Sequence, residues 1–92
     1  MDEATFRTQL AAAGCQEFRT IEWEANRSNS EHAHAFNAHG LILRGEFTLS
    51  TADWTRCFIA GDSYALPAGT THTEAVGADG VAILSGRVYP KA

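Results

Sequence analysis

The stretch that decides the fold runs Gly61-Asp62-Ser63-Tyr64-Ala65-Leu66-Pro67-Ala68-Gly69-Thr70-Thr71-His72. Proline followed two residues later by glycine predicts a type I turn from Leu66 to Gly69. Residues 63–66 and 70–76, on either side, have the composition of short β-strands. The stretch therefore predicts a tight turn between two strands, the second of which carries His72.

A second stretch upstream, His32-Ala33-His34-Ala35-Phe36-Asn37-Ala38-His39, contains the other three histidines of the chain. On a predicted strand over 31–36, His32 and His34 share a face, because successive side chains point to opposite sides. Their Cβ atoms would lie about 6.5–7 Å apart, close enough for both rings to reach one metal ion.

We therefore predict that all four histidines bind one metal ion. On an unbroken strand His39 would face away from His32 and His34. A break near residues 37–38 is expected, so His39 can still point to the same side as this pair. His72 comes from a distant strand, which a barrel would bring opposite the pair. The alternative is a barrel without metal, in which the four histidines are incidental.

The remaining chain predicts one helix followed by about eight short strands. A helix is expected over residues 3–13, with Phe6, Leu10 and Ala13 on one apolar stripe and Gly14 ending it. A polar loop is expected over 26–30.

From residue 18 onward the hydrophobic period is two, and turns are predicted at 44–46, 50–53, 61–62 and 79–80. The side chains expected to line the interior are Phe36, Leu41, Leu43, Phe47 and Phe58. Strands at this spacing, without long helices between them, predict an all-β sandwich or barrel rather than a parallel α/β sheet.

Composition excludes several classes of function. The 92 residues carry a net charge of −4, which does not suit a nucleic-acid-binding surface. No apolar run approaches the roughly 18 residues of a membrane span, and the start of the sequence does not resemble a signal peptide. We expect a cytoplasmic protein without nucleic-acid or membrane partners, and two reduced, mostly buried thiols at Cys15 and Cys57.

Both histidine stretches resemble the two motifs of the cupin family. The spacing Gly61-x5-Pro67-x-Gly69-x2-His72 matches the four main fixed positions of the second motif, and His32-x-His34-x4-His39-x5-Gly45 is similar to the first. The resemblance covers about residues 18–88. It implies an antiparallel double-stranded β-helix, the jelly-roll-like barrel of cupins, over residues 16–92, preceded by a helical segment over 1–15. It also implies a metal near one open end, and a homodimer.

The sequence departs from the family pattern at two positions. His39 stands where cupins usually have a glutamate ligand, and Val76 stands where they often have asparagine. The first departure leaves either a four-histidine site or a three-histidine site with His39 turned away.

Imidazole ligands favour a divalent transition metal: iron, nickel, zinc, copper or manganese. Our first hypothesis is a metal-dependent cupin acting on a small organic molecule, with non-haem dioxygenase chemistry. The alternatives are a non-catalytic ligand-binding or sensory module, and a barrel with a closed structural metal. Glu74 and Tyr64 are the candidate acid–base residues, with Glu74 also able to orient an imidazole.

Overall fold

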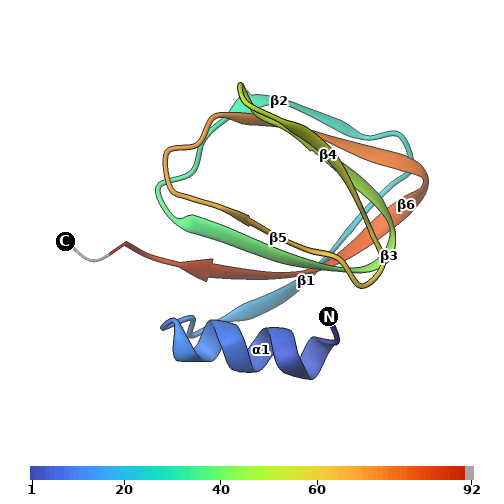
Figure 1. Cartoon of the computed structure of the whole chain (residues 1–92). Helices are drawn as coiled ribbons and strands as arrows, with labels where there is room; N and C mark the ends of the chain where they lie inside the picture. Colours follow the sequence, from blue (N-terminus) through green and yellow to red (C-terminus); the bar gives the residue numbers. More distant parts are fainter. Residues whose placement is uncertain (91–92) are drawn as a thin grey trace.

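The computed structural model describes residues 1–90 and contains one helix and six strands (Figure 1). The elements are α1 (Glu3–Ala12), β1 (Phe18–Trp23), β2 (Ser28–His32), β3 (Asn37–Ser50), β4 (Thr55–Ile59), β5 (Ser63–Leu66) and β6 (His72–Val88). The prediction of about eight short strands was wrong, because β3 and β6 are long strands of 14 and 17 residues. The predicted polar loop at 26–30 is also shorter than expected, because β2 already begins at Ser28.

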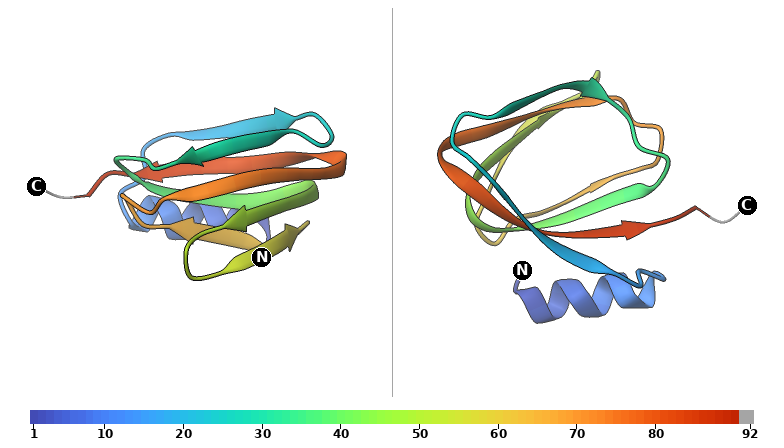
Figure 2. Two further views of the ribbon diagram at one scale, coloured as in Figure 1. Left: turned by 90° about the horizontal axis from the view of Figure 1, so that it is seen from above. Right: turned by 180° about the vertical axis from the view of Figure 1, so that it is seen from behind.

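All strand pairs are antiparallel, and β3 and β6 pair with each other along most of their length, from Asn37 opposite Val88 to Ser50 opposite Thr73. The C-terminal half of β6 also pairs with β1 and its N-terminal half with β2. In the same way, β5 pairs with the first half of β3 and β4 with the second half. Since both long strands bend in the middle, the sheet folds over into two facing layers (Figures 1 and 2).

The bend depends on glycines that face each other across the two long strands. Gly45 has φ +84° and Gly80 has φ +76°, and the β3–β6 register shifts on both sides of Arg44-Gly45. A Cβ atom at Gly45 would overlap the carbonyl oxygen of Gly80, so no larger residue fits there without moving the backbone. The hairpin turns predicted at 44–46 and 79–80 are therefore wrong: both sites are bends inside continuous strands.

The two layers do not close into a barrel. Within residues 1–90, no ladder joins the β1 and β2 edge of the sheet to the β4 and β5 edge. The prediction of an all-β antiparallel fold with one N-terminal helix is confirmed, while the expected closure of the sheet is not. The layers are joined at one end by the bend in β3 and β6, and at the other end by the connections from β2 to β3 and from β5 to β6 (Figure 1).

Two hydrophobic clusters hold the structure together. The inner core lies between the layers and contains Ile42, Phe47, Leu49, Phe58, Leu66, Val76, Val81 and Ile83. The outer core lies between α1 and the adjoining layer and contains Phe6, Leu10, Cys15, Leu41 and Leu84. Of the residues predicted to line the interior, Leu41 instead packs under the helix and Leu43 is 36% exposed. The register shift beside Arg44 explains this, because it reverses which side chains of β3 face inward.

Helix α1 forms as its sequence predicts. The carboxylate of Asp2 accepts a hydrogen bond from the backbone N–H of Thr5 at 2.8 Å, which caps the helix N-terminus. Gly14 follows the helix with φ +97°. Phe6 and Leu10 are buried against the sheet, whereas Ala13 is exposed, so the apolar stripe is shorter than predicted.

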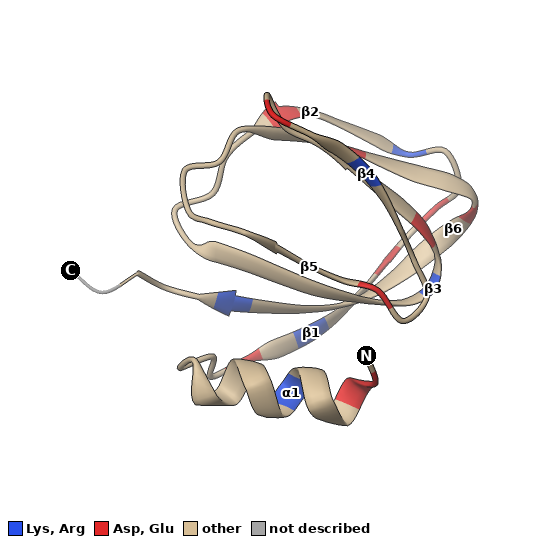
Figure 3. Cartoon of the chain, viewed as in Figure 1, with Lys and Arg blue, Asp and Glu red and all other residues tan. Residues whose placement is uncertain are grey.

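The outer surface is mixed in charge. Figure 3 shows acidic and basic residues interspersed over α1 and the strands, with no face dominated by one sign in this view. Both cysteines are free; Cys15 is buried, but Cys57 is exposed, which corrects the expectation of two mostly buried thiols. Within residues 1–90, helix α1 is neither long enough nor apolar enough to cross a membrane.

Candidate metal centre

Strand pairing brings the first two histidines together. His32 is the last residue of β2 and His72 the first of β6, and they are direct partners in the β2–β6 ladder. Cross-strand partners have neighbouring side chains on one face of the sheet, and here the ring centroids are 4.4 Å apart. The strand predicted to run to residue 36 ends at His32, so His34 lies in the connection to β3 rather than on a strand.

Two hydrogen bonds fix this connection beside the turn before β6. The backbone N–H of Gly69 donates to the carbonyl oxygen of His34 at 2.8 Å. The N–H of Ala68 donates to the side-chain oxygen of Asn37, also at 2.8 Å. His34 is thereby placed next to His72, with ring centroids 5.3 Å apart.

The turn itself differs from the prediction. Thr70 N–H donates to the carbonyl oxygen of Pro67 at 3.1 Å, and Gly69 has φ +82°. The turn therefore begins at Pro67, with glycine at the third position, which is the pattern of type II rather than type I.

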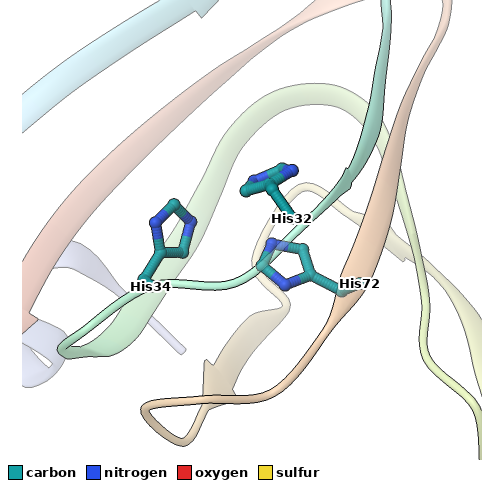
Figure 4. A group of neighbouring side chains, drawn as sticks. All are labelled: His32, His34 and His72. Atoms are coloured by element: carbon teal, nitrogen blue, oxygen red, sulfur yellow. The ribbon is translucent and has the colours of Figure 1, made fainter.

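His32, His34 and His72 form the histidine cluster (Figure 4). One ring nitrogen of each lies within 4.8 Å of those of the other two. The structure does not bring His39 into this group. On either side of it in β3, Ala38 packs on the inner core and Gly40 faces the ring of Tyr64, so the alternation of the strand turns His39 to the outer face. Burial there lowers the pKa of His39 below its ordinary value of 6.5.

Hydrogen bonds to backbone carbonyls fix the tautomers of two rings. Nδ1 of His72 is 2.9 Å from the carbonyl oxygen of Thr70, and Nδ1 of His32 is 2.7 Å from that of Ser30. Since a carbonyl oxygen only accepts, each Nδ1 must donate its proton, and the neutral ring then carries its lone pair on Nε2. In metal sites, a bond of this kind orients the coordinating histidine.

Within residues 1–90, the Nε2 atom of His72 has no hydrogen-bond partner, although His72 is only 2% exposed. A buried polar atom without a partner is unfavourable and requires an explanation. A metal ion bound between the rings would supply the missing partner. The donor set therefore fits a transition metal.

His34 presents a ring that is neutral at physiological pH. Partial burial, and next the charges that His32 and His72 carry when protonated, lower the pKa of His34 below its ordinary value of 6.5. The ring stacks on Phe36 with centroids 4.7 Å apart and an interplanar angle of 22°. The lowered pKa keeps the imidazole unprotonated, and the stacking on Phe36 holds its plane.

The histidine cluster lies on a pocket of about 550 Å³ between the two layers. Volumes in this range suit small organic ligands. Apart from the histidines, the charged residues that line it are Glu74 and Arg87. The side chain of His32 is 33% exposed, so the cluster is accessible from solvent.

Glu74 shares the inner face of β6 with His72, as predicted from their spacing. Its side chain is 10% exposed, and its carboxylate oxygens lie 3.4 Å from Nε2 of His32 and 3.7 Å from Nε2 of His72. Asn29 donates from Nδ2 to Oε1 of Glu74 at 2.8 Å. The sequence did not single out Asn29; only its place opposite Glu74 in the β2–β6 ladder identifies it.

Tyr64, the second acid–base candidate, also lines the pocket. Its ring packs between Phe47 and Phe58, with centroids 5.8 and 5.7 Å away, and it occupies the space that a side chain at Gly40 would need. Burial, and to a lesser extent the charge of Glu74, raise the pKa of the phenol above its ordinary value. Tyr64 is therefore a neutral hydroxyl near the site and not a base.

Comparison with solved structures identifies the fold. Neither a protein-family model nor a curated protein sequence matches the chain. A cupin-2 domain protein from Shewanella frigidimarina superimposes with a TM-score of 0.64 at 20% identity, over 74% of this chain and 65% of that one. A cupin superfamily protein from Desulfitobacterium hafniense gives 0.68 at 18% identity, over 82% and 80% of the two chains.

The W96Y variant of oxalate decarboxylase from Bacillus subtilis gives a TM-score of 0.72 at 14% identity, over 78% of this chain but only 20% of that protein. At such identities the likeness shows the fold and not the activity. The chain therefore has the cupin fold, and the resemblance seen in its two motifs is confirmed at that level. The chain covers 65% of the length of the Shewanella protein.

Proposed function

We propose that this protein binds one divalent transition metal through Nε2 of His32, Nε2 of His72 and a ring nitrogen of His34. The observation that carries the proposal is the unpartnered Nε2 of the buried His72, together with the two Nδ1 bonds that direct lone pairs toward the cluster. Imidazole nitrogens suit iron, nickel, copper and zinc. The metal would supply a Lewis-acidic centre to whatever molecule enters the pocket.

The metal site we propose keeps coordination positions free, in contrast to a structural zinc site, in which protein ligands fill all four tetrahedral positions. The side chain of His32 is one third exposed, and the histidine cluster lies on the wall of the pocket. Both features favour a centre that accepts an external ligand over a purely structural metal.

A small organic molecule bearing a carboxylate is the ligand that this pocket suits best. Arg87 lines the pocket, and its guanidinium lies 4.3 Å from the centroid of the Phe36 ring, which itself stacks on His34. An anion bound to the metal would therefore have a cationic partner near the mouth. Oxalate decarboxylase, whose name specifies a small dicarboxylate, has the same fold.

The enzymatic and the sensory versions of this proposal share the same metal and differ in turnover. Dioxygenase activity would require a redox-active metal such as iron and consumption of oxygen with the bound molecule. A sensory or binding module would hold the same ligand without changing it. Oxygen uptake by the Fe(II)-loaded protein with a panel of small carboxylates distinguishes the two.

Metal analysis of the purified chain tests the proposal. We expect about one transition metal per chain after loading and desalting, and a change in the visible spectrum of the Co(II) form when oxalate or a related carboxylate is added. Arg87→Gln should keep the metal but weaken the carboxylate response about tenfold. A chain that retains no metal would refute the proposal, and an unchanged response in R87Q would remove Arg87 from it.

A further inference from the structure

The carboxylate of Glu74 lies inside the molecule, facing two imidazoles of the histidine cluster. Its oxygens are 3.4 Å from Nε2 of His32 and 3.7 Å from Nε2 of His72, and its side chain is 10% exposed. Burying a carboxylate is costly unless its charge is compensated. The protein contact that compensates it is the hydrogen bond from Asn29 at 2.8 Å.

The atoms that face each other, Nε2 of His32, Nε2 of His72 and the two carboxylate oxygens of Glu74, are all acceptors. His32 and His72 donate from Nδ1 to backbone carbonyls, so each neutral ring turns a lone pair toward Glu74. A carboxylate beside two lone pairs is repulsive without a cation between them. The arrangement therefore requires either protons on the rings or a bound metal ion.

The separations agree with a shared metal. Two ligand atoms that are each about 2.1 Å from one ion lie about 3.0 Å apart at a right angle and about 3.4 Å apart at the tetrahedral angle. Oε1 of Glu74 lies 3.4 Å from Nε2 of His32, and Oε2 of Glu74 lies 3.7 Å from Nε2 of His72. Both are close to these values, whereas charge-assisted hydrogen bonds are shorter, near 2.8 Å.

We propose that Glu74 is the fourth protein ligand of the metal, through its carboxylate, and that Asn29 is the positioning residue that holds this carboxylate toward His32 and His72. The inference rests on the proposed function, because it adds a ligand to the same metal. It also gives the site a fourth protein ligand, a role that His39 does not fill because it lies outside the histidine cluster. The carboxylate comes from β6, two residues after His72, and Glu74 is the cross-strand partner of Asn29 in β2.

A carboxylate ligand has a consequence for metal preference. Oxygen donors favour manganese, whereas a purely imidazole site favours nickel, copper and zinc. Loss of Glu74 should therefore weaken Mn(II) binding much more than Ni(II) binding. An effect of Glu74 on folding alone would weaken both metals equally.

Isothermal titration of Mn(II) and Ni(II) into the metal-free full chain tests the inference. We expect Glu74→Gln to lower Mn(II) affinity at least tenfold and Ni(II) affinity by a smaller factor. Asn29→Ala should lower Mn(II) affinity less than E74Q does. The matched control is Glu31→Gln, because Glu31 precedes His32 in the chain but its side chain is exposed, and its affinities should equal those of the unmodified protein.

The outcomes separate this inference from the proposed function. If the unmodified chain binds neither metal, the metal centre itself is refuted, and the ligand role of Glu74 with it. If it binds and E74Q binds Mn(II) equally well, only the role of Glu74 is overturned. Should E74Q fail to fold by circular dichroism, Glu74→Asp replaces it: a shortened carboxylate that binds Mn(II) as tightly as the native one contradicts direct ligation.

Discussion

His32 and His72 face each other across the β2–β6 ladder, with ring centroids 4.4 Å apart, and each ring donates from Nδ1 to the carbonyl oxygen two residues before it. The same hydrogen-bonded ring geometry thus occurs at two histidines that are 40 positions apart in the chain. It sets both Nε2 atoms toward the same point.

The first prediction concerns which histidines hold the metal. His72→Ala and His32→Ala should each reduce metal content after desalting from about one ion per chain to near zero, because each removes one of three ring ligands. His39→Ala is the matched control, since its ring lies on the outer face and outside the histidine cluster. Metal analysis by mass spectrometry measures all three. Full loading in H72A, or complete loss in H39A, would contradict this assignment.

The second prediction is the pH dependence of metal binding. Protons compete with the metal for imidazole, so affinity should fall as the pH drops below about 6.5. Because burial lowers the pKa of His34, this ring resists protonation to a lower pH than an exposed histidine would. Titration of Ni(II) at pH 7.5, 6.5 and 5.5 should show most of the loss in the last interval. Affinity that is constant over this range would argue against histidine ligands.

The third prediction concerns the stability of the metal-free protein and His39. Burial lowers the pKa of His39 in the folded state, so between that value and 6.5 the unfolded chain binds more protons than the folded one. Its contribution to stability is therefore present above pH 6.5 and is lost as the pH falls through the folded pKa. Urea unfolding with a chelator at pH 7.5 and 5.0 should show a smaller loss for His39→Gln than for the unmodified chain. An equal loss in both proteins would contradict this prediction, because it would show that His39 binds protons equally well in the folded and the unfolded chain.

The fourth prediction tests the bend between the two layers. Gly45→Ala should destabilise the protein by about 2–4 kcal/mol, because it adds the strain of a positive φ to an overlap with the carbonyl oxygen of Gly80. Gly61→Ala is the control: Gly61 has φ +91° but open space around it, so only the strain applies. The free energy of unfolding in urea should fall more for G45A than for G61A. Equal losses would mean that the overlap with Gly80 adds nothing to the destabilisation caused by the positive φ.

The fifth prediction separates the helix from the metal centre. Leu10 is 6% exposed in the outer core, and Leu10→Ala should cost about 2–4 kcal/mol of stability through the cavity it leaves. Gln9→Ala, on the exposed side of the same helix, should cost less than about 0.5 kcal/mol. Both variants should bind metal with unchanged affinity under conditions where they remain folded. A marked loss of affinity in L10A would show that helix packing reaches the histidine cluster.

The order of residues along the chain was enough to predict the class of fold and the proximity of three histidines. The alternation of apolar residues after residue 18, the turn glycines and the two spaced histidine motifs predicted an all-β antiparallel fold with one short helix. They also predicted that His32, His34 and His72 lie close together, together with His39, which does not join them, and that Glu74 shares the face of His72. These features depend on the spacing of residues along the chain, which can be read directly from the sequence.

Only the tertiary structure decided the rest, because it depends on pairing between distant segments. Gly45 and Gly80 look like hairpin turns in the sequence, yet they meet across two long strands and bend them together. The resulting register shift placed Leu41 under the helix and left Leu43 exposed. His39 faces outward because Ala38 and Gly40 face the interior, and Asn29 reaches Glu74 because the β2–β6 ladder sets them opposite each other. Such partners are fixed by the register between strands that lie far apart in the sequence, and a shift of one residue turns every side chain to the other face.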